Sequence, residues 1–155
     1  MIKKCYLLLL FIVPYTAFSQ ELPFTYNYRT NNGYSGVKRS YEFFAKNDSV
    51  CVRTSECRHI WSGDEPKDTC VVSLKCGISN EVVDSVEKML LDADVFLWKQ
   101  SYYAKDVYDG DNWSLGVQIG ERQKWVDGYM DWPEKAPMWE INDLIRTLMV
   151  SDNKK

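Results

Sequence analysis

Alternating apolar and polar positions recur along most of the chain and predict a protein built largely from β-strands. Residues 22–28 (LPFTYNY) alternate with the period of a half-buried strand, and a second alternating run covers 37–43. The segment between them, RTNNGYSG, is rich in Asn and Gly, which tolerate positive φ, so it predicts a hairpin turn. Further strands are predicted near 49–60 and 69–76.

Two later segments repeat their apolar residues with the period of a helix. The first spans 79–93, can be capped by Ser79 or Asn80, and follows the hairpins. Its apolar face consists of Val82, Val83, Val86, Met89 and Leu90. The second helix follows Pro137. Its apolar stripe consists of Met138, Ile141, Leu144, Ile145 and Leu148.

Between the two helices, strand alternation returns over residues 113–119. A turn at Gly120–Glu121 then predicts an antiparallel return through QKWVDGYM. Hairpins interrupted by two amphipathic helices are typical of an α+β fold. We therefore expect an antiparallel sheet built from hairpins, with both helices packed on one face and one hairpin stapled by disulfides.

The N-terminus has the order of a secretory signal peptide. Two lysines precede a short apolar run, and small residues follow at Ala17 and Ser19, which predicts a signal over 1–19. An apolar run of about eight residues is too short to span a bilayer, and Cys5 precedes it, which argues against lipidation. We expect export to the periplasm or the exterior without a membrane anchor, one domain over 20–150, and a disordered tail at 151–155.

The segment CVRTSECRHIWSGDEPKDTCVVSLKC places four cysteines at a symmetric spacing. Directly opposed residues of an antiparallel hairpin have a constant sum of residue numbers, and Cys51 with Cys76 gives the same sum as Cys57 with Cys70. The centre of this register lies between Gly63 and Asp64, among turn-forming residues. In an exported chain this favours disulfides Cys51–Cys76 and Cys57–Cys70.

Two alternatives to this pairing remain open. The cysteines could instead be joined as near neighbours, Cys51 to Cys57 and Cys70 to Cys76, or could bind zinc. The gap of five residues within each half exceeds the two to four of the usual zinc knuckle, so zinc is disfavoured. The preferred register also places His59 opposite Asp68.

Charge and motifs limit the classes of function. The chain has 19 Lys and Arg against 22 Asp and Glu, and loss of the two signal-peptide lysines changes the net charge from −3 to −5. This argues against nucleic acid and anionic membrane as partners. His59 is the only histidine, and the chain has no G-x-S-x-G, H-E-x-x-H or phosphate-binding glycine loop. We therefore expect no catalytic residues, cofactor or metal.

Aspartates and aromatics remain as candidate contacts. The spacing of Asp106, Asp109 and Asp111 does not fit a calcium-binding loop, so we interpret this segment as a solvated turn. Trp113 begins an alternating strand and is expected in the core. Trp132, in YMDWPEKAP, is expected in a loop as an exposed contact. An exposed cluster of Trp125, Tyr129 and Trp132 would favour carbohydrate binding.

The order of these features resembles the emfourin type of small domain, whose members inhibit thermolysin-like metallopeptidases, and resembles equally other secreted domains of the same layout. The shared features cover most of the chain after the signal. They are Arg29 at the end of a strand, GYSG, VEKMLLDADVFLW, Asp111 with Trp113, WVDGYMDWPEKAP and the last helix. The hairpin over 51–76 is an addition to this order.

The resemblance implies a protein partner, of the peptidase class, and a contact loop. We assign that loop to Asn32, Gly33, Tyr34, Ser35 and Gly36, whose simpler role is to turn the hairpin. The function that the sequence favours is an exported, non-enzymatic domain that binds another macromolecule through loops at one end of its sheet. The alternatives are a small-ligand or carbohydrate-binding module and an enzyme of unrecognised type.

Overall fold

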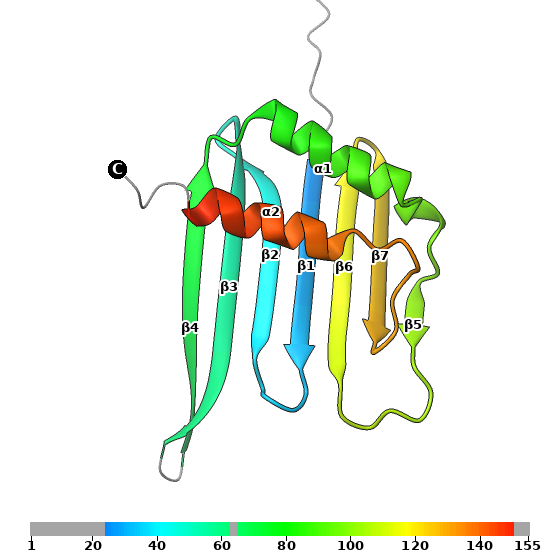
Figure 1. Cartoon of the computed structure of the whole chain (residues 1–155). Coiled ribbons are helices and arrows are strands. Elements are labelled where there is room, and N and C mark those ends of the chain that lie inside the picture. Colours follow the sequence, from blue (N-terminus) through cyan, green and yellow to red (C-terminus); the bar gives the residue numbers. More distant parts are fainter. Residues whose placement is uncertain (1–23, 63–64, 151–155) are drawn as a thin grey trace, which may run out of the picture.

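The computed structural model describes residues 24–62 and 65–150, which form a seven-stranded sheet with two helices across one face (Figure 1). The signal peptide predicted over 1–19 and the tail predicted at 151–155 lie outside these residues. The strands are β1 (Phe24–Asn32), β2 (Lys38–Lys46), β3 (Ser49–Ser62), β4 (Glu65–Cys76), β5 (Ser101–Tyr103), β6 (Asp111–Ile119) and β7 (Arg122–Tyr129). The helices are α1 (Asn80–Asp92), α2 (Met138–Val150) and the short 3₁₀ helix η1 (Val95–Leu97).

The strand order in the sheet is β4-β3-β2-β1-β6-β7-β5. The three predicted hairpins are present as β1–β2, β3–β4 and β6–β7, and β1 also pairs antiparallel with β6. The expectation of a wholly antiparallel sheet was wrong at one edge, where β5 runs parallel to β7. α1 carries the chain across the sheet to that edge, so β5 enters from the end at which β7 begins (Figure 1).

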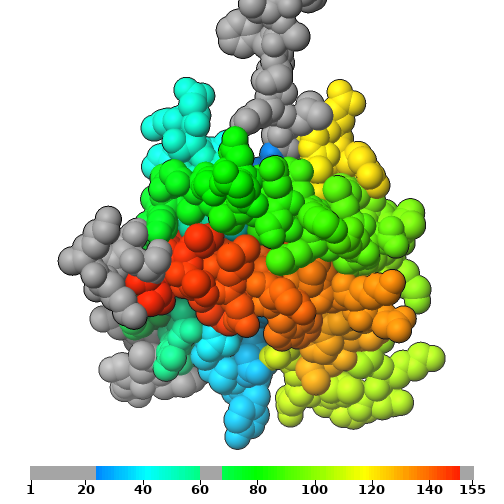
Figure 2. All heavy atoms as spheres, turned by 45° about the horizontal axis from the view of Figure 1, so that its top comes forward, coloured from blue at the N-terminus to red at the C-terminus, as the bar shows by residue number. Residues whose placement is uncertain are grey.

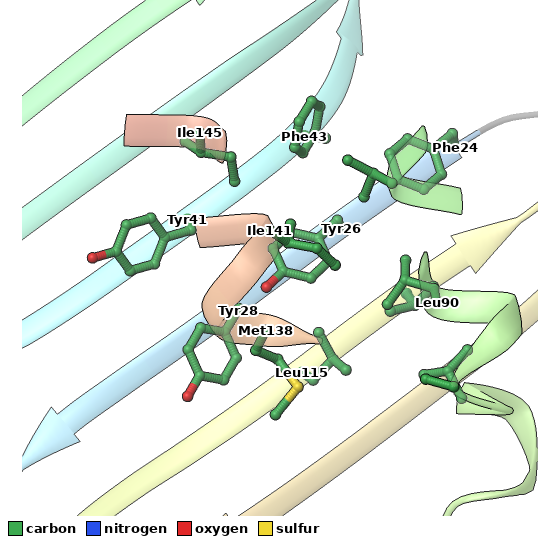
Figure 3. Close-up of a cluster of buried hydrophobic side chains, with 14 of the residues drawn as sticks. Phe24, Tyr26, Tyr28, Tyr41, Phe43, Leu90, Leu115, Met138, Ile141 and Ile145 are labelled. Atoms are coloured by element: carbon green, nitrogen blue, oxygen red, sulfur yellow. The ribbon is translucent and has the colours of Figure 1, made fainter. Parts of the chain in front are cut away.

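The helices cover only one face of the sheet. α1 and α2 lie side by side over it (Figure 2), and alternate residues of each strand point toward them. Figure 3 shows this core between β1, β2, β6 and the two helices. Its largest fully buried side chains are Tyr26, Phe43, Leu90, Leu115, Met138, Ile141 and Ile145. The other residues of the strands point to the opposite side, which we call the open face.

Both helices bury the stripe expected from the sequence. In α1, Val83, Val86 and Leu90 are buried, and Val82 and Met89 are partly buried. In α2, the predicted residues Met138, Ile141 and Ile145 are buried, and Leu144 and Leu148 pack against the core. Each helix therefore packs on the sheet through its apolar side chains. Burial of one such side chain contributes about 1.5–3 kcal/mol to the stability of the fold.

A buried hydrogen bond fixes α2 over the centre of the sheet. The hydroxyl of Tyr26 on β1 donates to Asn142 Oδ1 on α2 at 3.0 Å, across 116 positions of the chain. Burial, with smaller contributions from Tyr28 and Tyr41, raises the pKa of Tyr26 well above its ordinary value. Because an unsatisfied buried polar group costs about 1–3 kcal/mol, this bond also disfavours other placements of the helix.

The cysteine register predicted from the sequence is confirmed. Cys51 pairs with Cys76 and Cys57 with Cys70 in the β3–β4 ladder, and each pair forms a disulfide. His59 lies opposite Asp68, and the distance between His59 Nδ1 and Asp68 Oδ1 is 2.7 Å. The predicted turn centre at residues 63–64 lies outside the described residues. Disulfides of this kind are typical of proteins that fold in an oxidising compartment.

Removal of either disulfide should destabilise the domain without changing the fold of the remainder. We expect Cys51→Ala with Cys76→Ala to cost roughly 2–4 kcal/mol, and Cys57→Ala with Cys70→Ala to cost less, because the outer bond closes the longer loop. Urea unfolding of the two double variants measures both values, and non-reducing peptide mapping identifies the links. Recovery of a Cys51–Cys57 peptide from the unmodified protein would contradict the register.

A loop end and a serine trough as candidate binding sites

Three connections gather at one end of the sheet. The β1–β2 and β5–β6 connections, residues 33–37 and 104–110, lie at the lower end in Figure 1, and the β7–α2 connection, residues 130–137, starts at the tip of β7 and rises from there to α2. We call these three connections together the loop end. It contains the predicted contact loop and Trp132. Asn32, Ser35 and Trp132 line one pocket of about 220 Å³ there. Two candidates that were separate in the sequence therefore form parts of one region.

Hydrogen bonds within the β1–β2 loop fix its shape. The amide of Ser35 donates to Asn32 Oδ1 at 2.6 Å, and the amide of Gly36 donates to the Asn32 carbonyl at 2.9 Å. Gly36 has a φ of 63°, a conformation that glycine adopts without the steric cost of a side chain. The loop therefore turns the β1–β2 hairpin, as the sequence predicted, and its own hydrogen bonds hold its shape.

The same loop is tied to its neighbour, the β5–β6 connection. The amide of Gly33 donates to the Gly110 carbonyl at 3.2 Å, and Asn32 Nδ2 donates to Asp111 Oδ1 at 2.6 Å. A Cβ at position 33 would lie 3.0 Å from that carbonyl oxygen, so glycine permits the close approach. These contacts join the two loops into one unit.

Two tyrosines project from the joined loops into solvent. Tyr34 in the first loop is 90% exposed, and Tyr108 in the second is 91% exposed. Tyr108 was not among the predicted contacts, since its segment shows no periodicity and no turn motif that would assign it a position. A tyrosine offers large apolar area and a hydroxyl with few rotatable bonds, which suits it to protein contacts.

Trp132 is more buried than the sequence suggested. Its ring is partly buried against the core and meets Trp139 of α2 edge to face, with ring centroids 5.6 Å apart. Its indole nitrogen is buried. Trp125 lies on the open face instead, so Trp125 and Trp132 do not form one platform. Trp113 is 3% exposed, as expected for a core residue.

The pocket below the loops is lined by polar groups from β1, β2 and α2. The guanidinium of Arg146 donates from Nε to the Tyr41 hydroxyl at 3.2 Å, and its ring contact with Tyr41 places the charge 5.0 Å from the ring centroid. Burial raises the pKa of Tyr28 to about 12, while the neighbouring Trp132 indole acts in the opposite direction. Tyr28 is therefore neutral at any physiological pH.

Because of this shift, stability should fall at alkaline pH. Unfolded tyrosine ionises near pH 10, whereas Tyr28 in the folded protein keeps its proton to about pH 12. Between these values the unfolded state binds fewer protons, so the free energy of unfolding falls by about 1.4 kcal/mol per pH unit. Urea unfolding at pH 9, 10.5 and 11.5 should show a smaller fall for Tyr28→Phe than for the unmodified protein. Equal slopes would contradict the assignment.

The open face holds a second, larger hollow, about 670 Å³ in volume. Three short side chains, Ser40, Ser55 and Ser114, line it from β2, β3 and β6. The strand register places Ser55 beside Ser40, Ser40 beside Arg29, and Arg29 beside Ser114. These serines form the floor of a trough that runs across the strands, and we call it the serine trough.

A buried carboxylate with two arginines forms one wall of the serine trough. Glu42 is 6% exposed although it lies on the open face. Its carboxylate accepts hydrogen bonds from Arg53 and from Asn27 Nδ2, and Arg29 lies 4.0 Å away. The side chains of Arg29 and Arg53 are 60% and 47% exposed. The surface that a ligand would meet on this wall is therefore cationic, with the negative charge beneath it.

Aromatic residues extend the open face toward β7 and β5. Trp125 is 52% exposed and lies over Gly116 of the neighbouring strand, where an added Cβ would come within 2.8 Å of its ring. At the end of the trough, Tyr103 donates its hydroxyl to Asp127 Oδ2 at 2.6 Å. The face is thus a row of polar side chains with an exposed ring on β7 and another on β5.

No local sequence pattern predicts the serine trough. Each of its residues comes from a different strand, and only the pairing of β1 with β6 brings the two halves together. The polar positions of β1 and β6 do include several Asn and Ser residues, Asn27, Asn31, Asn112 and Ser114. That pattern indicates a polar face of the sheet, but it does not show which of these residues lie side by side.

Comparison with known proteins gives no relative from which a site could be assigned. No protein-family model matches the chain, and no curated protein matches it significantly. Within residues 24–62 and 65–150, no three His, Cys, Asp or Glu side chains are grouped so as to hold a metal ion. No helix of the described chain is long and apolar enough to cross a membrane.

Proposed function

We propose that the chain is an exported, non-catalytic binding domain that holds a protein partner through its loop end. The observation that carries this proposal is Tyr34, 90% exposed on a loop that is braced internally and tied to the β5–β6 connection. A side chain held outward in advance loses little conformational entropy on binding, so more of its contact energy contributes to affinity.

Tyr108 supports the same proposal. It is as exposed as Tyr34, and the two loops that carry them are joined through Gly33 and Gly110. Two exposed tyrosines on joined loops provide aromatic side chains of the kind that commonly dominate protein interfaces. The pocket lined by Asn32, Ser35 and Trp132 lies next to them and would receive a side chain of the partner.

The non-catalytic part of the proposal rests on the chemistry of the candidate nucleophile and base. The cysteines at 51, 57, 70 and 76 are all in disulfides, so none of them supplies a thiolate. His59 is exposed on the β3–β4 hairpin and faces Asp68, whose pKa it lowers through their hydrogen bond. Because this pair links the two strands of the hairpin, we assign His59 a structural role.

A thermolysin-like metallopeptidase is the partner class to test first, because the order of the elements resembles that of emfourin-type inhibitors. We expect the purified protein to inhibit such a peptidase, and Tyr34→Ala to weaken inhibition by about 1–3 kcal/mol, or roughly 5- to 150-fold in the inhibition constant. Tyr34→Phe should retain most of the affinity, since it keeps the ring. Inhibition constants for the three proteins measure this directly.

A matched control separates contact from a general loss of apolar surface. Leu97 is 80% exposed on η1 and belongs to none of the three connections, so Leu97→Ala should leave inhibition unchanged. Circular dichroism checks the fold of each variant. Absence of inhibition by the unmodified protein would exclude the peptidase tested, and inhibition unaffected by Tyr34→Ala would move the contact away from this loop.

A further inference from the structure

We propose that the serine trough on the open face binds an acidic polysaccharide, with the sugar chain lying across the strands. This site is separate from the loop end and does not depend on the function proposed there. Its residues come from all seven strands, from β4 at one edge to β5 at the other. At about 4.8 Å between neighbouring strands, the seven strands span about 29 Å, which is enough for several sugar rings in a row.

The shape of the trough follows from one cross-strand row. Paired residues along it are Val72, Ser55, Ser40, Arg29, Ser114 and Asp127. The next row toward β1's N-terminal end holds the longer side chains of Arg53, Glu42 and Asn27. Serines between longer neighbours leave a hollow whose 670 Å³ falls within the range typical of ligand sites.

The charge of the trough favours an anionic ligand. Arg29 and Arg53 share one buried carboxylate, Glu42, and Lys38 lies on the opposite side of the row. The carboxylate of Asp127, at the far end, already accepts the Tyr103 hydroxyl. Exposed guanidinium groups with unused donors bind carboxylate or sulfate groups through paired hydrogen bonds. This cationic surface stands out on a chain whose net charge is −3.

The remaining groups favour a sugar over a peptide. Ser40 and Ser55 hydroxyls lie 2.8 Å apart, and Asn31, Asn112 and Ser114 add amides and a further hydroxyl, which can each donate and accept as sugar hydroxyls do. The strands under the middle of the trough, β3, β2, β1 and β6, are each paired on both sides, so a peptide lying there could not bind by adding a strand. Recognition must use side chains.

Exposed aromatic rings lie where a sugar chain would leave the row of serines. Tyr103 is 61% exposed at the β5 end of the trough. Trp125 is 52% exposed, one row away on β7, with its ring against Gly116. Both present an apolar surface beside polar side chains, the combination found in sites that hold a ligand by a few placed hydrogen bonds and an apolar wall.

Affinity electrophoresis of the purified protein tests the proposal. The gels contain polygalacturonate as the carboxylated chain, dextran sulfate as the sulfated chain, dextran as the neutral chain, or polyglutamate as an acidic peptide. We expect retardation by at least one acidic polysaccharide, weaker at higher salt, and none by dextran. The carboxylated and sulfated gels together identify which anion is preferred.

Three variants locate the binding. Arg29→Gln should weaken binding at least tenfold, because Arg29 is central in the row and its loss leaves Arg53 paired with Glu42. Ser114→Leu fills the floor without changing charge and should weaken binding similarly. Arg58→Gln is the control: Arg58 is on the same strand as Arg53, pairs with Glu56, and points to the other face.

Binding to the acidic polysaccharides but not to dextran or polyglutamate would support the proposal. Retardation by neither acidic polysaccharide, or equal retardation by dextran or polyglutamate, would overturn it. Equal loss in Arg29→Gln and Arg58→Gln would overturn the placement in the trough, since it would indicate attraction by overall charge. Tyr34→Ala should bind the polysaccharide as the unmodified protein does, so a failure here is distinguishable from a failure of the loop-end proposal.

Discussion

The packing of α2 against β1 is the contact on which the rest of the structure depends. The Tyr26 hydroxyl and Asn142 set where the helix crosses, and Ile141 and Ile145 bury its apolar stripe on the same strands. With α2 in that position, the β7–α2 connection runs from the tip of β7 back to the start of the helix (Figure 1). Trp132 on that connection lines one pocket with Asn32 and Ser35, so the helix placement contributes to the pocket at the loop end.

The same packing leaves the other face of the sheet without a covering layer. A two-layer domain buries its apolar core on the side that the helices cover, and the opposite side faces water and is mostly polar. Short polar side chains meet that requirement, and they also make a trough. The two candidate sites are therefore consequences of one architecture: the first forms where the helix layer ends, and the second forms where there is no helix layer.

Local patterns predicted the parts of this fold that depend on neighbouring residues. The cysteine spacing predicted the β3–β4 register, including His59 opposite Asp68, because a hairpin is set by its own sequence. The buried faces of α1 and α2 were also predicted, from the helical period of their apolar residues. The parallel strand β5 was not, since three residues are too few to show a period and its partner β7 follows more than twenty residues later.

The candidate sites show the same division. The loop at Asn32–Gly36 was predicted because Asn and Gly mark a turn, and its exposure follows from that. Its bond to Gly110 and the presence of Tyr108 beside it required the β1–β6 pairing, which joins residues about 80 positions apart. The serine trough depends on that pairing as well. No local motif around Ser40, Ser55 or Ser114 predicts that these residues lie in one hollow.

The two disulfides of the β3–β4 hairpin hold an edge strand of the sheet in place. Within the described sheet, β4 forms one edge, and Val71, Val72 and Leu74 on it are half or more exposed. An apolar edge strand is a template for pairing with other chains, especially when it can peel from its neighbour. Two covalent links to β3 prevent that peeling. Without these two bonds, β4 could detach from β3, and the backbone groups that now pair the two strands would also become available to other chains.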